Sequence, residues 1–338
     1  MRRATFSKVA WATLGYTIAV ILWGAYVRAS GSGAGCGSHW PTCHGEVLPR
    51  APTTATVIEL THRVTSGLAL LSVVVQLVLS RRTFASGHLA RRAAGWSLFF
   101  MVTEALVGAG LVIFEKVAHD KSLARGWWMG AHLINTFMLI ASMALVVFAA
   151  SREGPAFARP KGRPALLLGA GLGALLLTGV SGAVAALGDT LFPADSFREG
   201  FAMDLHPEAH VFLQLRALHP FVAALTAVLL LYVGSSFARS GAEPATRRAA
   251  HALAGLVVLQ VGVGLLNLLL AAPTAMQLVH LLFADAVWLA TVALTACVAT
   301  EAATSAARSH VEADVSEEVV LRGEVAPATL LADVERKA

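Results

Sequence analysis

The sequence predicts an all-α integral membrane protein with eight transmembrane helices, arranged as two pseudo-symmetric four-helix bundles. Three observations predict this fold class: the composition, the spacing of apolar runs and a similarity between the two halves of the chain. Of the 338 residues, 56% are hydrophobic and only 14% are charged, with a mean hydropathy of +0.67. Because soluble globular proteins carry about 25% charged residues, the composition excludes an ordinary soluble enzyme and predicts a chain solvated mainly by lipid.

Eight apolar runs are long enough to span a membrane, which takes about 20 residues because the hydrocarbon core is about 30 Å thick. The first run is too long, and is followed by too many others, to be a cleaved signal peptide. The predicted spans are residues 9–27, 58–80, 94–114, 128–150, 165–187, 210–235, 249–271 and 277–301.

The basic residues predict the orientation of these spans. Fourteen Lys and Arg residues lie in the N-terminus and in the loops after the second, fourth and sixth spans, against six in the alternating loops. By the positive-inside rule, both termini are expected in the cytoplasm. The net charge of +5 does not indicate a nucleic-acid partner, since these residues form no patch.

The two halves carry similar segments at a nearly constant offset. His62 in the second span matches His219 in the sixth, and His132 in the fourth matches His280 in the eighth. Four spans return the chain to the same side, so this pattern predicts a parallel duplication. The expected domains are an N-terminal bundle (1–150), a C-terminal bundle (151–302) and a loose cytoplasmic tail (303–338), which is polar and lacks aromatic residues.

These four histidines are the strongest candidates for a functional site. Each lies a turn or two inside an even-numbered span, in the part of the membrane predicted to be outer. Ionisable residues inside spans are costly and usually functional. Two facing imidazoles suit a porphyrin iron with both axial positions filled, whereas zinc is disfavoured because the spans offer no cysteine or carboxylate set. The sequence therefore predicts one haem site per half.

Glycines in the third and seventh spans admit two interpretations, which stay open. They could make room for a flat macrocycle beside a helix, or they could serve close helix packing. The residues concerned are Gly108, Gly110, Gly262 and Gly264.

The halves differ next to the histidines. Glu59 precedes His62 by three residues, on the same helical face, and the matching position of the second half is Arg216. Glu59 is a candidate proton donor or acceptor; the alternative is a surface carboxylate paired with Arg63 or Arg28. Arg216 is either a propionate-binding residue or an interfacial snorkelling residue, and Arg28 and Arg63 are further candidates for propionate contacts.

The first predicted outer loop, residues 29–57, contains Cys36 and Cys43, which can reach disulfide geometry in an oxidising compartment. A structural staple and a redox-active pair both remain open. Cys297, deep in the last span, is expected to pack as a small apolar residue.

Three motifs in the first half resemble the haem A synthase family, and the four histidines fall where that family has them. The resemblance covers roughly residues 10–300. Its motifs are GAYVRASGSGAGCG at 24–37, WPTCHG at 40–45 and IELTHR at 58–63.

The resemblance implies an oxidoreductase that converts the methyl group at ring position 8 of haem O into a formyl group, giving haem A for terminal oxidases. His62 and His132 would then be axial ligands of the substrate haem, and Glu59 would match the family's essential carboxylate. His219 and His280 would bind a permanent haem b cofactor. The implied setting is a bacterial inner membrane with the haem sites toward the outer side.

The expected partners are an unidentified electron carrier, haem O synthase (a farnesyltransferase) as the enzyme that hands over the substrate, membrane lipid, and a second copy of the chain in a homo-oligomer.

One departure from the family concerns the loop 188–209, which lacks the second cysteine pair of some bacterial members. His206 lies there instead, with His210 just after the loop, and both are expected to face solvent, as are His39, His44 and His119. Two rival functions remain: a di-haem b-type cytochrome linked to quinone, which leaves Glu59 unexplained, and a transporter built from a parallel repeat.

Overall fold

The computed structural model describes residues 2–151, 157–239 and 241–322, which form nine α-helices and one short 3-10 helix. Eight of these helices are long and apolar enough to cross a membrane, so the protein is an all-α integral membrane protein, as predicted. The elements are α1 (Arg3–Ala29), η1 (Ser32–Ala34), α2 (Thr54–Thr83), α3 (Leu89–Ile113), α4 (Leu123–Ala150), α5 (Arg163–Leu191), α6 (Phe197–Asp204), α7 (Val211–Arg239), α8 (Pro244–Leu269) and α9 (Thr274–Arg322).

Local sequence signals set where several helices begin. The Thr53 hydroxyl accepts the backbone N–H of Thr56 at 3.2 Å at the start of α2, and His88 Nδ1 accepts the N–H of Ala90 at the start of α3. Proline lies in the first turn of α5 and α8, where its missing N–H costs nothing. All eight predicted spans are confirmed, with bounds that shift by a few residues except at the end of α9.

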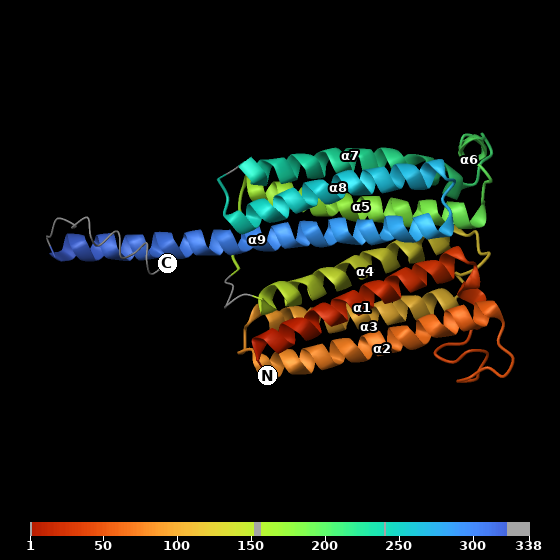
Figure 1. Ribbon diagram of the computed structural model, residues 1–338, viewed down its shortest axis with the longest axis horizontal. Coiled ribbons are helices and arrows are strands. Elements are labelled where there is room, and N and C mark those ends of the chain that lie inside the picture. Colours follow the sequence, from red (N-terminus) through yellow and green to blue (C-terminus); the bar gives the residue numbers. More distant parts are fainter. Residues whose placement is uncertain (1, 152–156, 240, 323–338) are drawn as a thin grey trace.

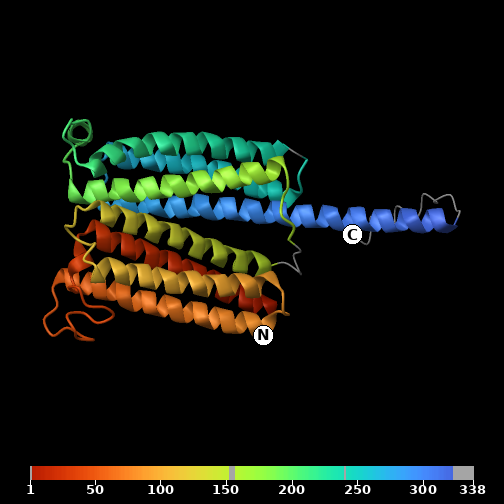
Figure 2. The same ribbon diagram turned by 180° about the vertical axis from the view of Figure 1, so that it is seen from behind.

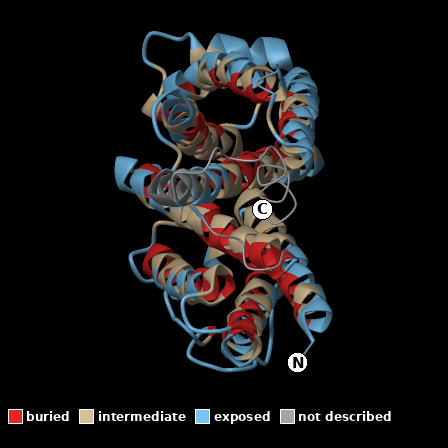
Figure 3. Ribbon diagram, turned by 90° about the vertical axis from the view of Figure 1, so that its left-hand side faces the viewer, coloured by how far each residue is buried: buried red, intermediate tan, exposed pale blue. Residues whose placement is uncertain are grey.

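The spanning helices form two groups (Figure 1). In the first group α1 contacts α2, α2 contacts α3, α3 contacts α4, and α4 contacts α1. In the second group α5, α7, α8 and α9 contact one another in the same cyclic way. Figure 3 shows both groups end-on. The internal duplication that the sequence suggests stays a prediction, and so does the cytoplasmic placement of the termini.

The two groups meet along α4 and α9, which lie side by side in both views (Figures 1 and 2). These helices are the most buried of the eight, with 56% and 50% of their most apolar stretch inside the protein. Trp288 of α9 stacks on Phe137 of α4 and donates its indole N–H to the Phe137 carbonyl at 2.7 Å. The indole N–H of this large buried side chain therefore has a hydrogen-bond acceptor at the contact between α4 and α9.

Two elements differ from the sequence prediction. α9 continues to Arg322 and projects beyond the other helices (Figure 1), so residues 303–322 are helical where a loose tail was expected. This stretch is rich in alanine and charged helix formers and contains no glycine or proline. The rest of the predicted tail, 323–338, lies outside the described residues. The loop 188–209 contains α6, which is capped by the Ser196 side chain and is too short and polar to predict from an apolar run.

Candidate haem-binding site

Helices α7 and α9 bring the rings of His219 and His280 next to each other, edge to face. Their ring centroids lie 6.4 Å apart and their planes are inclined by 84°. A metal ion sits about 2.0 Å from an imidazole nitrogen, so two rings on opposite sides of one ion have centroids about 6 Å apart. The structure therefore brings together the two histidines that the sequence paired in the second half, at a spacing that fits one ion between them.

In the first half, His62 of α2 and His132 of α4 lie close enough to interact electrostatically. The Nδ1 atoms of both rings are buried without a hydrogen-bond partner, as is Nδ1 of His280. His219 Nδ1 lies 2.9 Å from the Ser181 hydroxyl. Buried polar atoms are normally satisfied, so three unpaired imidazole nitrogens call for an explanation.

Each of the four rings lies against a glycine of a neighbouring helix. A Cβ atom at the glycine would come within 3.0 Å of the ring in three cases, and at 3.9 Å in the fourth. The pairs are Gly24–His62 (2.8 Å), Gly182–His219 (3.0 Å), Gly264–His280 (2.9 Å) and Gly108–His132 (3.9 Å), all measured to Cε1 of the ring. A side chain at Gly24 or Gly264 would therefore force the neighbouring ring to shift, and one at Gly182 would press against the His219 ring.

These features fit a haem in each half. Within the described ranges, no cluster of three or more His, Cys, Asp or Glu residues is arranged to hold a metal ion. Each histidine pair can therefore supply two ligands, which is the number a porphyrin iron leaves open. The glycines beside the four rings match such a use, since they let each imidazole lie close to a neighbouring helix.

The structure separates the two interpretations of the glycines. Gly108 and Gly264 face the candidate ligands, whereas a Cβ atom at Gly110 would meet the Trp128 ring at 2.6 Å. Gly110 therefore serves close helix packing. Gly262 has no such neighbour within 4 Å.

Replacing Gly264 by alanine is expected to push the His280 ring out of place, because the added methyl group would lie 2.9 Å from Cε1. For a haem held by His219 and His280, the expected result is loss of most of its absorbance in the purified protein. Gly262→Ala is the matched control on the same helix, since its methyl group enters open space and glycine-to-alanine changes in helices otherwise stabilise by about 0.5–1 kcal/mol. Equal haem content in Gly264→Ala and Gly262→Ala would show that the space beside the His280 ring does not matter for haem binding.

Glu59 is buried, with 4% of its surface exposed, and its carboxylate contacts two groups. Oε2 accepts the backbone N–H of Cys36 at 2.8 Å, and Oε1 pairs with the Arg63 guanidinium. Arg63 also donates to the carbonyls of His39 and Thr42, each at 2.6 Å. The ion pair with Arg63 that the sequence left as an alternative is present within α2. The bond from the Cys36 N–H to Glu59 and the bonds from Arg63 to the loop carbonyls connect α2 to the first predicted outer loop.

That loop is closed by the predicted disulfide. Cys36 and Cys43 are bonded, with their Cα atoms 4.4 Å apart, and both side chains are fully buried. His44 Nε2 lies 2.9 Å from the Gly35 carbonyl, inside the same loop.

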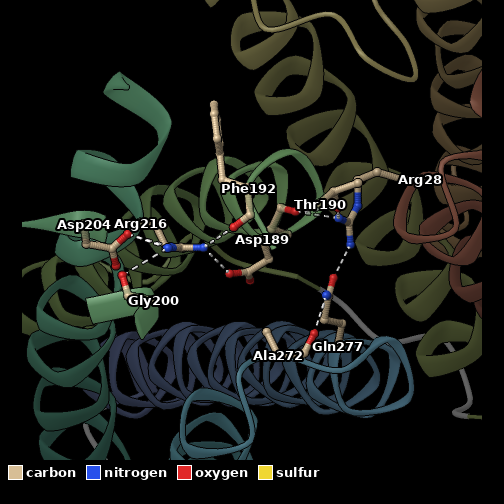
Figure 4. Close-up of polar contacts among 10 residues, drawn as sticks. Arg28, Asp189, Thr190, Phe192, Gly200, Asp204, Arg216, Ala272 and Gln277 are labelled. Atoms are coloured by element: carbon tan, nitrogen blue, oxygen red, sulfur yellow. Dashed lines mark hydrogen bonds and ion pairs between the residues drawn. The ribbon is translucent and has the colours of Figure 1, made fainter. Parts of the chain in front are cut away.

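The other two candidate arginines form a polar network near the ends of α5 and α7 (Figure 4). Arg28 of α1 donates to the Thr190 hydroxyl at 2.7 Å and to Gln277 Oε1 at 2.9 Å, and so ties the first half to α5 and α9. Arg216 pairs with Asp189 at 3.1 Å and with Asp204 at 2.6 Å. These contacts fix the loop 188–209 over α7. Propionate binding by Arg28, Arg63 or Arg216 stays a prediction.

The remaining candidates have local contacts. His206 Nδ1 accepts the N–H of Glu208, and His210 Nδ1 accepts the N–H of Phe212 at the start of α7. Cys297 is buried, as expected for a small packing residue.

A family model described as cytochrome oxidase assembly protein (COX15-CtaA) matches residues 7–292. The chain belongs to this family. The resemblance inferred from the motifs of the first half is thereby confirmed over both halves.

Individual relatives differ in how much they share. The chain is 49% identical over 292 residues to a "Protoheme IX farnesyltransferase" of Thermus thermophilus, a match that covers 86% of this chain but 48% of that relative. The chain thus spans about half the length of the curated Thermus relatives that it matches. It is also 39% identical over 100 residues to a "Heme A synthase" of Bacillus mycoides, covering 30% of this chain and 32% of the relative.

Two acidic residues inside the spans were missed by the sequence analysis, which found no carboxylate set there. Glu104 of α3 lies 3.5 Å from His132 Nδ1. Asp285 of α9 is 1% exposed, and neither of its oxygens has a hydrogen-bond partner. Both residues lie in apolar spans. Because ionisable residues inside spans are usually functional, their positions in the sequence could have identified them as candidates.

Proposed function

We propose that the protein is a haem A synthase, which oxidises the ring-position-8 methyl group of haem O to a formyl group. The observation that carries the proposal is the pairing of two histidines in each half, in a chain that belongs to a cytochrome oxidase assembly family. Relatives named heme A synthase in Bacillus species support it. The product would be haem A for a terminal oxidase, made at a site toward the outer side of a bacterial inner membrane.

The first half (1–150) would bind the substrate haem through His62 and His132, and the second half (151–302) would bind haem b through His219 and His280. Support for this division comes from the carboxylates. Glu59 is the buried acidic residue one turn from His62, and the corresponding position of the second half is Arg216.

The residues of the first half would divide the work as follows. Gly24 leaves room for the His62 ring, and the disulfide loop, held down by Arg63, would shield the outer side from water. Glu59 would take up or release protons at its carboxylate oxygens, since converting a methyl to a formyl group with water as the oxygen source releases four protons and four electrons. The haem iron supplies the oxidising chemistry when bound, and an unidentified electron carrier would accept the electrons.

Haem O synthase is the proposed partner for handover of the substrate. The Thermus relative named for a farnesyltransferase extends well beyond the matched region, which accounts for 48% of it. If the farnesyltransferase lies in that other half, the enzyme that makes haem O and a region similar to this chain are parts of one polypeptide. Such a fusion supports direct handover of haem O between the two enzymes where they are separate proteins.

The function is tested by expressing the full chain in a bacterial host that makes haem O but not haem A. Haem A is expected in the extracted pigments, and a His62→Ala variant expressed at the same level is expected to yield haem O alone. Accumulation of haem O with a haem-loaded wild-type protein would contradict the proposal.

That contrary result would favour a di-haem b-type cytochrome, the second candidate. The observation in its favour is the equivalence of the histidine and glycine pairs in the two halves. It would leave the carboxylates next to the first pair without a role.

A further inference from the structure

We propose that Glu104 is a positioning residue for His132, holding the Nδ1–H of the imidazole so that Nε2 is free to bind iron. The inference rests on the proposed function, because it assumes that His132 is an axial ligand of the first-half haem. It adds a carboxylate from a different helix to the site.

Two side chains of α4 anchor the Glu104 carboxylate. Asn135 Nδ2 donates to Oε2 at 2.6 Å, and the Thr136 hydroxyl donates to Oε1. Asn135 is itself fixed by donating to the Phe100 carbonyl at 2.8 Å and by accepting from the Thr103 hydroxyl at 2.6 Å. Donors on α4 and groups on α3 thus hold the carboxylate in one place.

The anchored carboxylate faces the ligand ring. Oε1 of Glu104 lies 3.5 Å from Nδ1 of His132, with the two side chains 17% and 26% exposed. This separation is about 0.5 Å longer than the usual N–H···O distance of about 2.9–3.0 Å. A shift of the imidazole by about 0.5 Å would bring Nδ1 within hydrogen-bond distance of Oε1. The Nδ1 atom has no other hydrogen-bond partner, so the carboxylate is the acceptor at hand.

No other candidate ligand has this arrangement in the described part of the chain. Nδ1 of His62 and of His280 has no partner, and Nδ1 of His219 meets a neutral serine hydroxyl. His132 is the one histidine among the four with a carboxylate oxygen within 4 Å.

The second half carries an amide where the first carries the carboxylate. Glu104 lies four residues before Gly108, which faces His132, and Gln260 lies four residues before Gly264, which faces His280. The Gln260 side-chain oxygen is buried without a partner. The carboxylate is therefore specific to the half proposed to bind the substrate.

The chemical consequence follows from how metal-bound histidines behave. A carboxylate that accepts the second ring N–H fixes the tautomer and ring orientation and makes the ligand more basic, and removing such a partner typically weakens metal binding about 10–100-fold. A more basic axial ligand also favours the higher oxidation states of the iron. Glu104 would thus make those states easier to reach at the first-half haem, while the second-half haem, without this partner, serves electron transfer.

The test uses the haem-depleted full chain in detergent, titrated with haemin, together with the electron paramagnetic resonance spectrum and redox titration of the loaded protein. Glu104→Gln is expected to weaken one of the two haemin sites about 10–100-fold, to shift the low-spin signal of that component and to raise its midpoint potential. The other component should not change. Thr136→Val, which removes one anchor only, should shift the same component less, and serves if Glu104→Gln folds poorly.

Gln260→Ala is the matched control, and it should leave the affected component as in the wild type. Unchanged affinity, signal and potential in Glu104→Gln and Thr136→Val would overturn the inference, as would a loss of thermal stability without a spectroscopic change. Failure of the proposed function is distinguishable, since a di-haem cytochrome would show the same changes in Glu104→Gln while the wild-type protein forms no haem A.

Discussion

Replacing His132 by alanine is expected to abolish haem A formation, while the haem b that we propose His219 and His280 to bind is expected to remain. The imidazole is one of two protein ligands that the first half can offer, because no larger ligand cluster exists in the described residues. Its loss would leave His62 alone to hold the substrate haem in the first half. The measurement is the haem A content of cells expressing the variant, together with the haem b content of the purified protein.

His206→Ala is a suitable control, because that histidine lies in the loop 188–209 and contacts only a local backbone N–H. Added imidazole is expected to restore part of the low-spin spectrum of His132→Ala by filling the vacated position. Normal haem A formation in His132→Ala would show that the first-half ligand pair is wrong.

Glu59→Gln is expected to lower haem A formation at least about 100-fold, the lower limit usually found for general acid–base groups, with haem b retained. Glutamine keeps an oxygen that can accept the Cys36 N–H, but it cannot exchange protons at neutral pH. The variant therefore removes the proposed proton function while it can keep the hydrogen bond from the Cys36 N–H. Haem O, haem A and haem b are measured in the same extract.

Arg63→Gln separates proton handling from loop anchoring. It removes the ion pair and the bonds to the His39 and Thr42 carbonyls but leaves the carboxylate. If anchoring is the main role of Glu59, Arg63→Gln will be as inactive as Glu59→Gln. If Glu59 handles protons, Arg63→Gln will lose thermal stability but retain more activity.

The sequence predicted the fold well because lipid imposes a simple rule. Every span had to be an apolar run of about 20 residues, and all eight were found. The exception is α9, whose continuation to Arg322 depends on helix propensity rather than on hydropathy.

The histidine pairs were also predictable, since their equivalent positions in the two halves are visible in the sequence. The environment of each ring was not. Glu104 approaches His132 from α3, and sequence separation hides a contact between neighbouring helices. In α8, Gly264 faces His280, whereas Gly262 has open space beside it. Which of the two glycines faces the ring depends on how α8 is rotated about its axis, and the sequence does not show this rotation.

Glu59 shows a different limit. The sequence placed it beside His62 and left two roles open, and the structure adds the contacts with Arg63 and Cys36. Those contacts depend on the path of the loop 29–57, which no helical periodicity describes.

The account is tested most directly by extracting haem from the purified protein with acidified acetone and analysing it by chromatography with mass detection. It predicts haem b together with haem O, its hydroxylated intermediate or haem A, with the haem b lost in a His219→Ala variant. Haem b alone, at two per chain, would contradict the account and make the protein a di-haem cytochrome.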